Sequence, residues 1–262
     1  MTVIDDLARA AYLAVVSDFD GTLAPFAVDR YSVQANGAAL AALQRLAAAA
    51  RTTAAVLSGR DVEGLRRVCH LEPPVIFGGS HGAETAPATG GEITGGLDDA
   101  GRAHLEKMKA AVEDLVARHP GTEVELKPYQ VVLHARELQL RDPAAAEAAL
   151  QAATTVDPSP YPFTLGKSVA EFSATTATKG TWLGELRERL EAETGQPVTL
   201  VFLGDDLTDE DGFAALDYSP ADGRVSDVGI KVGDGETAGN HRLADVEAVA
   251  EFLTQLADAR SA

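Results

Sequence analysis

The sequence predicts an α/β fold with a parallel sheet, into which a smaller α+β segment is inserted. Three observations support this prediction. Short apolar runs alternate with helix-like segments near both ends of the chain, which is typical of a parallel sheet with right-handed crossovers. Between residues 97 and 173 the order changes to pairs of consecutive strands, which favours a small antiparallel sheet. Several apolar runs also end on polar residues, as expected where an open sheet places its ligand site.

The first part of the chain alternates strand and helix. A short helical segment precedes Tyr12, and the apolar run that ends at residue 17 predicts a strand buried on both faces. Gly21 then permits a tight turn, because it has no Cβ atom. We expect the next elements to be a helix at 38–50, a strand at 53–57, a helix at 61–70 and a strand at 75–77.

The middle of the chain has a different order. Residues 86–96 are rich in Gly, Thr and Pro and predict a loop or a turn-rich hairpin. An αββαββ order follows, with a helix at 97–119, strands at 123–127 and 131–136, a helix at 143–154, and strands at 163–165 and 168–172. We therefore expect an α+β insert at 97–173, which interrupts a discontinuous core made of residues 1–96 and 174–262.

The last part of the chain returns to alternation. The expected elements are a helix at 179–193, a strand at 198–203, a strand at 227–232 and a closing helix at 245–257. The strand at 198–203 ends on a dense acidic run that begins at Asp205. Carboxylates therefore follow the strand at 198–203, as they follow the strand before Asp18 in the first part of the chain.

Composition excludes several classes of protein. The formal net charge of −18 argues against nucleic acid or an anionic membrane as a partner, because both carry negative charge. The single cysteine, Cys69, excludes an intrachain disulfide framework. No apolar run reaches the roughly 18 residues of a membrane span, and no signal segment is evident. We expect a cytoplasmic protein with no obligate protein partner, whose substrate is a small molecule.

Polar residues at the strand ends predict one composite site. If the sheet is parallel, its carboxyl ends share one edge, and Lys179 at the start of a helix can lie at the same edge. The residues that this edge would bring together are Asp18, Asp20, Ser58, His81, Lys179, Asp205, Asp206 and Asp209.

The aspartates predict a magnesium site. Asp18 and Asp20 share a face of a regular strand, so both can ionise comfortably only beside a cation. Mg²⁺ takes oxygen ligands and keeps several waters. We expect Asp18, the backbone carbonyl of Asp20 and Asp205 to be its protein ligands. Asp206 and Asp209 are expected to hold waters or Lys179 behind them.

This arrangement predicts phosphoryl transfer. Asp18 would attack the phosphorus atom, while Asp20 protonates the leaving oxygen and later activates water. Lys179 and the hydroxyl and N–H groups around Ser58 would stabilise the transferred phosphoryl group. For the aspartates alone, an Asp-Gly turn and a capped, charged helix start are the structural alternatives.

The longer motifs resemble those of a known family. The stretch 18–23, Asp-Phe-Asp-Gly-Thr-Leu, is similar to the first motif of the haloacid dehalogenase (HAD) phosphatases. Together with Ser58-Gly59-Arg60, Lys179-Gly180 and the acidic segment 204–213, it resembles the trehalose-6-phosphate phosphatases. Matches at 79–84, 125–127, 134–136 and Glu171 extend the similarity over nearly the whole chain.

This resemblance implies a fold and further site residues. The fold would be a Rossmann-like HAD core with an inserted α+β cap whose residues grip the sugars. Asp18, Asp20 and Lys179 would be catalytic, and Asp18, Asp20, Asp205, Asp206 and Asp209 would surround the metal. The substrate-binding positions that it implies are Thr22, Ser58, Gly59, Arg60, His81, Lys127, His134, Arg136 and Glu171.

Three functions remain open from the sequence. The first is a Mg²⁺-dependent trehalose-6-phosphate phosphatase. The second is the same chemistry on sucrose phosphate, a glucosyl- or mannosylglycerate phosphate, or a pseudo-disaccharide phosphate, with a phosphohexomutase as a distant variant. Departures from the family pattern at 170–176 and 239–241 keep this second function open. The third is a non-catalytic sugar-phosphate sensor, which the intact set of Asp18, Asp20, Lys179 and Asp205 argues against.

Overall fold

The computed structural model describes residues 2–27, 31–166 and 168–261. It divides into two compact units. The first unit contains the residues up to Gly95 and those from Ala177 onward, and the second is Gly96–Thr176.

A mixed, mainly parallel sheet forms the centre of the first unit. Its strand order is β12-β11-β10-β1-β2-β3-β4-β5, and neighbouring strands from β12 to β3 pair in parallel, whereas β4 and β5 are antiparallel. The strands are β1 Tyr12–Ser17, β2 Thr52–Leu57, β3 Ile76–Gly79, β4 Glu84–Pro87, β5 Thr94–Gly95, β10 Val198–Gly204, β11 Val228–Val232 and β12 His241–Leu243.

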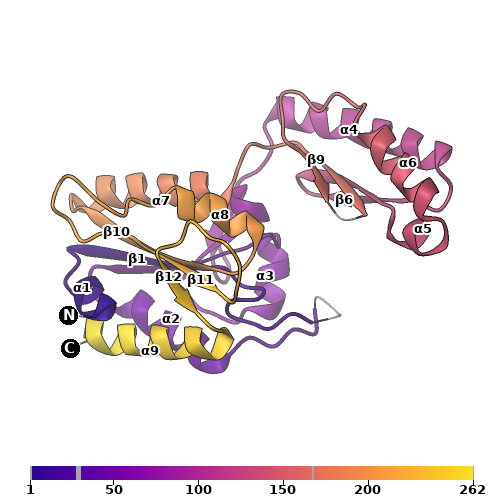
Figure 1. The fold of residues 1–262 in the computed structure, drawn as a ribbon. Coiled ribbons are helices and arrows are strands. Elements are labelled where there is room, and N and C mark those ends of the chain that lie inside the picture. The colour runs from indigo at the N-terminus through magenta and orange to yellow at the C-terminus, as the bar shows by residue number, and fades with distance from the viewer. Residues whose placement is uncertain (1, 28–30, 167, 262) are drawn as a thin grey trace. The chain divides into compact units, whose positions relative to one another are not determined.

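Helices cover both faces of this sheet (Figure 1). On one face α2 and α9 pack against Leu13, Val15 and Val201, and on the other α7 and α8 pack against Val16 and Phe202. The helical elements of this unit are α1 Val3–Ala8, α2 Gly37–Ala48, α3 Val62–Val68, the 3₁₀ turn η1 Ser80–Gly82, α7 Lys179–Thr194, α8 Leu207–Ala214 and α9 Val246–Ser261. Because helices cover both faces, the central strands have no solvent-facing side, and their sequences are nearly continuous apolar runs.

Strand register brings the motif segments together. Ser17 at the end of β1 is paired with Leu203 of β10 and with Val56 of β2. The backbone N–H of Asp18 extends this pairing, because it donates to the carbonyl of Leu203 over 2.8 Å. The residues that follow all three strands therefore lie side by side at one edge of the sheet.

The second unit is a four-stranded antiparallel sheet with helices on one face. Its strand order is β6-β7-β9-β8, and Met108, Leu133 and Phe172 belong to its buried core. Its elements are α4 Asp99–Arg118, β6 Glu123–Lys127, β7 Gln130–His134, α5 Arg136–Arg141, α6 Pro143–Ala153, β8 Phe163–Gly166 and β9 Val169–Ser173.

The α/β fold class is confirmed, and several of the expected elements need correction. The predicted strand 131–136 ends at His134, because Ala135 has a ψ of 10°, and Arg136 begins the short helix α5. The order of the second unit is thus αββααββ. Helix α8, which follows the acidic run, and the short edge strand β12 were not among the expected elements.

None of the helices in the described part of the chain has both the length and the apolar character that crossing a membrane requires. The cytoplasmic location stays a prediction.

Candidate active site

Asp18 lies beside a buried lysine. It follows β1, is 5% exposed, and accepts a hydrogen bond of 2.7 Å from Nζ of Lys179. Lys179 is the first residue of α7, after the N-cap Thr178, and donates a second bond of 2.6 Å to Asp209. The ammonium therefore bridges two carboxylates, one that directly follows β1 and one in the first turn of α8.

Asp209 organises the loop between β10 and α8. Its fully buried carboxylate accepts the backbone N–H groups of Asp205 and Asp206, each over 2.9 Å, as well as Lys179. Gly204 makes room for it, since a Cβ atom there would lie 2.2 Å from the carboxyl carbon of Asp209. Asp209 thus fixes the backbone of this loop.

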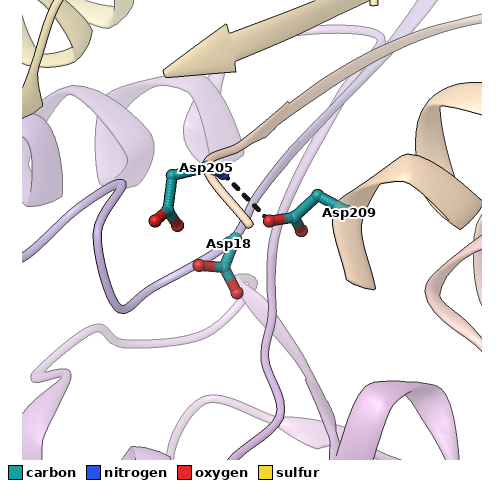
Figure 2. Close-up of side chains that lie close together, drawn as sticks. All are labelled: Asp18, Asp205 and Asp209. Carbon is teal, nitrogen blue, oxygen red and sulfur yellow. Dashed lines mark hydrogen bonds between the residues drawn. The ribbon is translucent and has the colours of Figure 1, made fainter. Parts of the chain in front are cut away.

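Asp205 lies directly over the turn that follows Asp18. A Cβ atom on Gly21 would be 2.2 Å from an Asp205 carboxylate oxygen, and Gly21 also has a positive φ of 87°, so only glycine fits there. The hydroxyl of Thr22 donates to Asp205 over 3.4 Å. Oxygen atoms of Asp18, Asp205 and Asp209 all lie within 4.8 Å of one another, and Figure 2 shows these three side chains gathered together.

The electrostatics of this cluster favour a bound cation. Burial raises the pKa of Asp18 well above its usual range, against the effect of Lys179 and together with Asp209 and Asp205. Burial and the Asp209 and Asp206 carboxylates raise the pKa of Asp205 to about 6. Burial opposes the protonation of Lys179, but its two carboxylate partners raise its pKa, so the lysine stays charged. A hard divalent cation with oxygen ligands fits this donor set and would offset the remaining repulsion.

Asp20 has an unexpected partner. Both of its carboxylate oxygens accept hydrogen bonds from the guanidinium of Arg60, from Nε over 2.6 Å and from Nη2 over 2.7 Å. Arg60 is only 7% exposed, and the hydrogen bond to Asp20 raises its pKa. The family resemblance implies that Arg60 is a substrate contact, whereas the structure pairs it with Asp20, the predicted acid/base.

Ser58, Gly59 and His81 lie together at the ends of β2 and β3. The backbone N–H of His81 donates to the carbonyl of Ser58 over 2.9 Å. The imidazole of His81 lies against Gly59, where a Cβ atom would be 2.6 Å from the ring. Ser80 and His81 both have positive φ, of 51° and 58°, which is backbone strain of the kind found at functional sites.

A cavity of about 330 Å³ opens over these residues. Its lining includes predicted site residues from every motif of the first unit, and also Phe26, Ala27 and Thr208, which sequence reasoning did not single out. Phe26 is 73% exposed, and a lone aromatic residue in a loop gives no pattern that marks it in the sequence. The predicted residues in the lining are Asp18, Asp20, Ser58, Gly59, Arg60, His81, Lys179 and Asp206.

Lys127, His134 and Glu171 share one face of the second unit's sheet, opposite the face that packs on α4. The strand register pairs Glu171 with Val132, and Nζ of Lys127 donates to Glu171 over 3.3 Å. Nε2 of His134 lies 2.9 Å from Glu125 of β6. Arg136, also a predicted substrate contact, lies outside this sheet on α5 and is exposed. The substrate-binding roles of all four predicted residues stay predictions.

The family follows from a sequence profile. The profile described as Trehalose-phosphatase matches residues 16–247, which is most of the chain. The chain belongs to the trehalose-phosphatase family. Its matched region runs from the end of strand β1 into the first turn of α9 and contains every site residue described above.

Curated relatives with this name are found in mycobacteria. The trehalose-phosphate phosphatase of Mycobacterium avium (strain 104) is 35% identical over 253 residues, which cover 94% of this chain and 62% of that protein. The trehalose-phosphate phosphatase of Mycobacterium tuberculosis (strain ATCC 25618 / H37Rv) is 34% identical over 249 residues, covering 93% and 61%. This trehalose-phosphatase family member thus spans less than two thirds of the length of these relatives.

Solved structures share the fold. Trehalose-6-phosphate phosphatase of Aspergillus fumigatus superposes with a TM-score of 0.76 at 22% identity, covering 98% of this chain and 96% of the other. The C-terminal domain of the Candida albicans trehalose synthase regulatory protein superposes with a TM-score of 0.69 at 15% identity, covering 96% and 95%. The fold therefore occurs in a protein named as a phosphatase and in one named as a regulator, so the function must be argued from the site.

Proposed function

We propose that this chain is a Mg²⁺-dependent phosphatase that hydrolyses trehalose 6-phosphate to trehalose and phosphate. The observation that carries the proposal is the position of Asp18. This carboxylate lines the cavity, is bound by a charged lysine, and lies within reach of two further carboxylates. A nucleophile, a cation and a metal-ligand set at one edge of the sheet are the parts that phosphoryl transfer through an aspartyl phosphate requires.

Asp18, Asp205 and the backbone carbonyl of Asp20 would hold the metal. Asp209 is better suited to hold the surrounding residues in place than to bind the metal itself, because its two oxygens already accept three hydrogen bonds. Asp206 caps α8 and accepts both the N–H and the hydroxyl of Thr208, so it too is held by the protein. When bound, Mg²⁺ supplies positive charge that offsets the negative charge of the phosphate and of the aspartates.

The reaction proceeds in two steps. An Asp18 oxygen attacks phosphorus, the bond from phosphorus to the sugar oxygen breaks, and that oxygen takes a proton from Asp20. Asp20 then accepts a proton from a water that attacks the aspartyl phosphate, which releases phosphate and restores Asp18. Lys179 holds Asp18 in place, and Ser58 lines the cavity, where its hydroxyl would contact phosphate oxygens.

The Arg60–Asp20 pair adds a requirement to this mechanism. A carboxylate that accepts two charge-assisted bonds from a guanidinium is held firmly in one position. For Asp20 to protonate the leaving oxygen, this pair has to open when the substrate enters. Opening of the pair would let the Arg60 guanidinium turn towards the phosphate, in keeping with its predicted role as a substrate contact.

The sugar rings would be recognised by the polar face of the second unit, which serves as the cap. Glu171, Lys127 and His134 offer acceptors and donors side by side on that face. A carboxylate accepts two hydroxyl hydrogen bonds at once, which suits a pyranose. A site that hydrogen-bonds hydroxyl groups rejects analogues that lack them more strongly than an apolar pocket rejects added bulk.

Phosphate release from a panel of sugar phosphates tests the proposal. We expect the fastest release, measured as kcat/KM, from trehalose 6-phosphate, with full loss in excess chelator and recovery when Mg²⁺ is restored. Faster release from sucrose phosphate, glucosylglycerate phosphate or glucose 6-phosphate would assign another substrate. Full activity in excess chelator would contradict the metal. Binding of trehalose 6-phosphate with no release at any Mg²⁺ concentration would identify a sensor.

Substitution of Glu171 by alanine tests the cap separately. We expect kcat/KM for trehalose 6-phosphate to fall roughly 10- to 100-fold, the value of a hydrogen bond to a charged group. Release from a small aryl phosphate should change little, because this substrate has no sugar for the cap to bind. The matched control is Glu147→Ala, which removes an exposed carboxylate from α6 of the same unit. Equal losses on both substrates would mean that Glu171 supports folding and does not recognise sugar.

A further inference from the structure

A buried lysine at the end of β11 contacts the same loop that carries the candidate metal ligand. Lys231 is 5% exposed, and its Nζ donates a hydrogen bond of 2.5 Å to the backbone carbonyl of Asp205. The strand register explains this reach, because Lys231 pairs with Gly204, the residue before Asp205. The lysine also lies 3.7 Å from a carboxylate oxygen of Glu210.

The burial of this charge calls for a local reason. All five residues of β11 are buried, and its neighbours Ile230 and Val232 pack into the apolar core on the opposite face. A charged group at such a position costs free energy unless it is hydrogen-bonded and paired. The only hydrogen bond that the described structure gives Nζ of Lys231 goes to the Asp205 carbonyl. Lys231 is also absent from the described residues that line the cavity.

The Asp205 segment is consequently held from two sides. Asp209 accepts the N–H groups of Asp205 and Asp206, and Lys231 binds the carbonyl of Asp205. Together these bonds fix the peptide groups on both sides of the Asp205 Cα atom. They thereby set the direction of its side chain, which lies over Gly21 near Asp18.

We propose that Lys231 is a positioning residue for metal binding, which clamps the Asp205 carbonyl so that the Asp205 carboxylate is preset for a divalent cation. This inference rests on the proposed function only in taking Mg²⁺ as the metal. Lys231 acts through Asp205 and touches neither the substrate nor the reacting atoms.

Two physical effects of removing Lys231 have opposite signs, which makes the inference testable. Loss of a positive charge near the carboxylates would by itself strengthen Mg²⁺ binding, because it removes Coulomb repulsion between the lysine and the cation. Loss of the clamp frees the loop and weakens binding, since partners behind metal ligands typically contribute 10- to 100-fold in metal affinity. The direction of the change therefore separates positioning from simple charge.

The experiment measures Mg²⁺ affinity without substrate, from the rise of the melting temperature with Mg²⁺ concentration. For Lys231→Met we expect Mg²⁺ to bind about tenfold more weakly than to the wild type. We also expect a higher Mg²⁺ requirement for phosphate release, with KM for the sugar phosphate nearly unchanged at saturating Mg²⁺. Lys231→Gln keeps an N–H donor without the charge. It should bind Mg²⁺ with intermediate affinity, and it decides the question if Lys231→Met does not fold.

The matched control is Val232→Ala, which loosens β11 from its other face without contacting Asp205. Equal or tighter Mg²⁺ binding by the Lys231 variants, or the same weakening in Val232→Ala, would overturn the inference. A wild type that binds Mg²⁺ but releases no phosphate would contradict the proposed function and leave this comparison intact.

Discussion

Replacement of Asp18 by asparagine is expected to lower kcat on trehalose 6-phosphate by roughly 10⁴-fold or more. The amide has almost the same shape as the carboxylate but carries no charge, so it cannot attack phosphorus. Its oxygen can still accept the hydrogen bond from Lys179, which also keeps its contact with Asp209. The protein should therefore stay folded, and single-turnover phosphate release at saturating Mg²⁺ is the measurement.

The control for this substitution is Asp234→Asn, which makes the same chemical change at an exposed loop position. It should leave kcat within about twofold of the wild type, because surface substitutions away from a site have small effects. A melting temperature for Asp18→Asn at or above that of the wild type would show that lost activity is not lost structure. Appreciable turnover by a folded Asp18→Asn protein would remove Asp18 as the nucleophile.

The position of the site could be predicted because it depends on strands and strand ends. Apolar runs such as the one before Asp18 identify buried parallel strands, and a parallel sheet then places Asp18, Ser58 and Asp205 at one edge. The register confirms this arrangement, with Ser17 opposite Leu203 and Val56.

The side-chain partners could not be predicted in the same way. Arg60 has a long side chain that can reach several neighbours, and only the folded loop shows that it meets Asp20. The contact of Lys231 is with a backbone carbonyl, which no residue type in the sequence records. The same limit applies to β12, because its three residues are mostly exposed and show no apolar pattern.

The second large effect is expected for Lys179→Met, on both stability and activity. The substitution removes the ammonium that lies 2.7 Å from Asp18 and 2.6 Å from Asp209, and leaves two buried carboxylates without their cation. Breaking a buried pair in this way typically costs about 3–5 kcal/mol of unfolding free energy. Activity should fall by roughly 10³-fold or more, because Asp18 loses both its orientation and its counter-charge.

The stability loss of Lys179→Met should depend on pH with a defined sign. Burial already raises the pKa of Asp18, and removal of the ammonium raises it further above the value in the unfolded chain. A carboxyl group whose pKa is higher in the folded state favours folding when it is protonated, so the variant becomes less stable as the pH rises. Denaturant unfolding in excess chelator at pH 5 and pH 8 should show the larger deficit, relative to the wild type, at pH 8.

Two further variants separate this effect from the loss of a lysine as such. Lys109→Met on α4 removes a partly exposed lysine whose ion pair with Glu106 spans 4.0 Å, and should change the unfolding free energy by less than about 0.5 kcal/mol. The double variant Lys179→Met with Asp209→Asn removes one of the two carboxylate charges that lost their lysine partner. The amide oxygen of the new asparagine can still accept the N–H groups of Asp205 and Asp206. It should recover much of the lost stability but none of the activity, since Asp18 still lacks its ammonium. A Lys179→Met protein as stable as the wild type at pH 8 would show that the lysine does not neutralise these carboxylates.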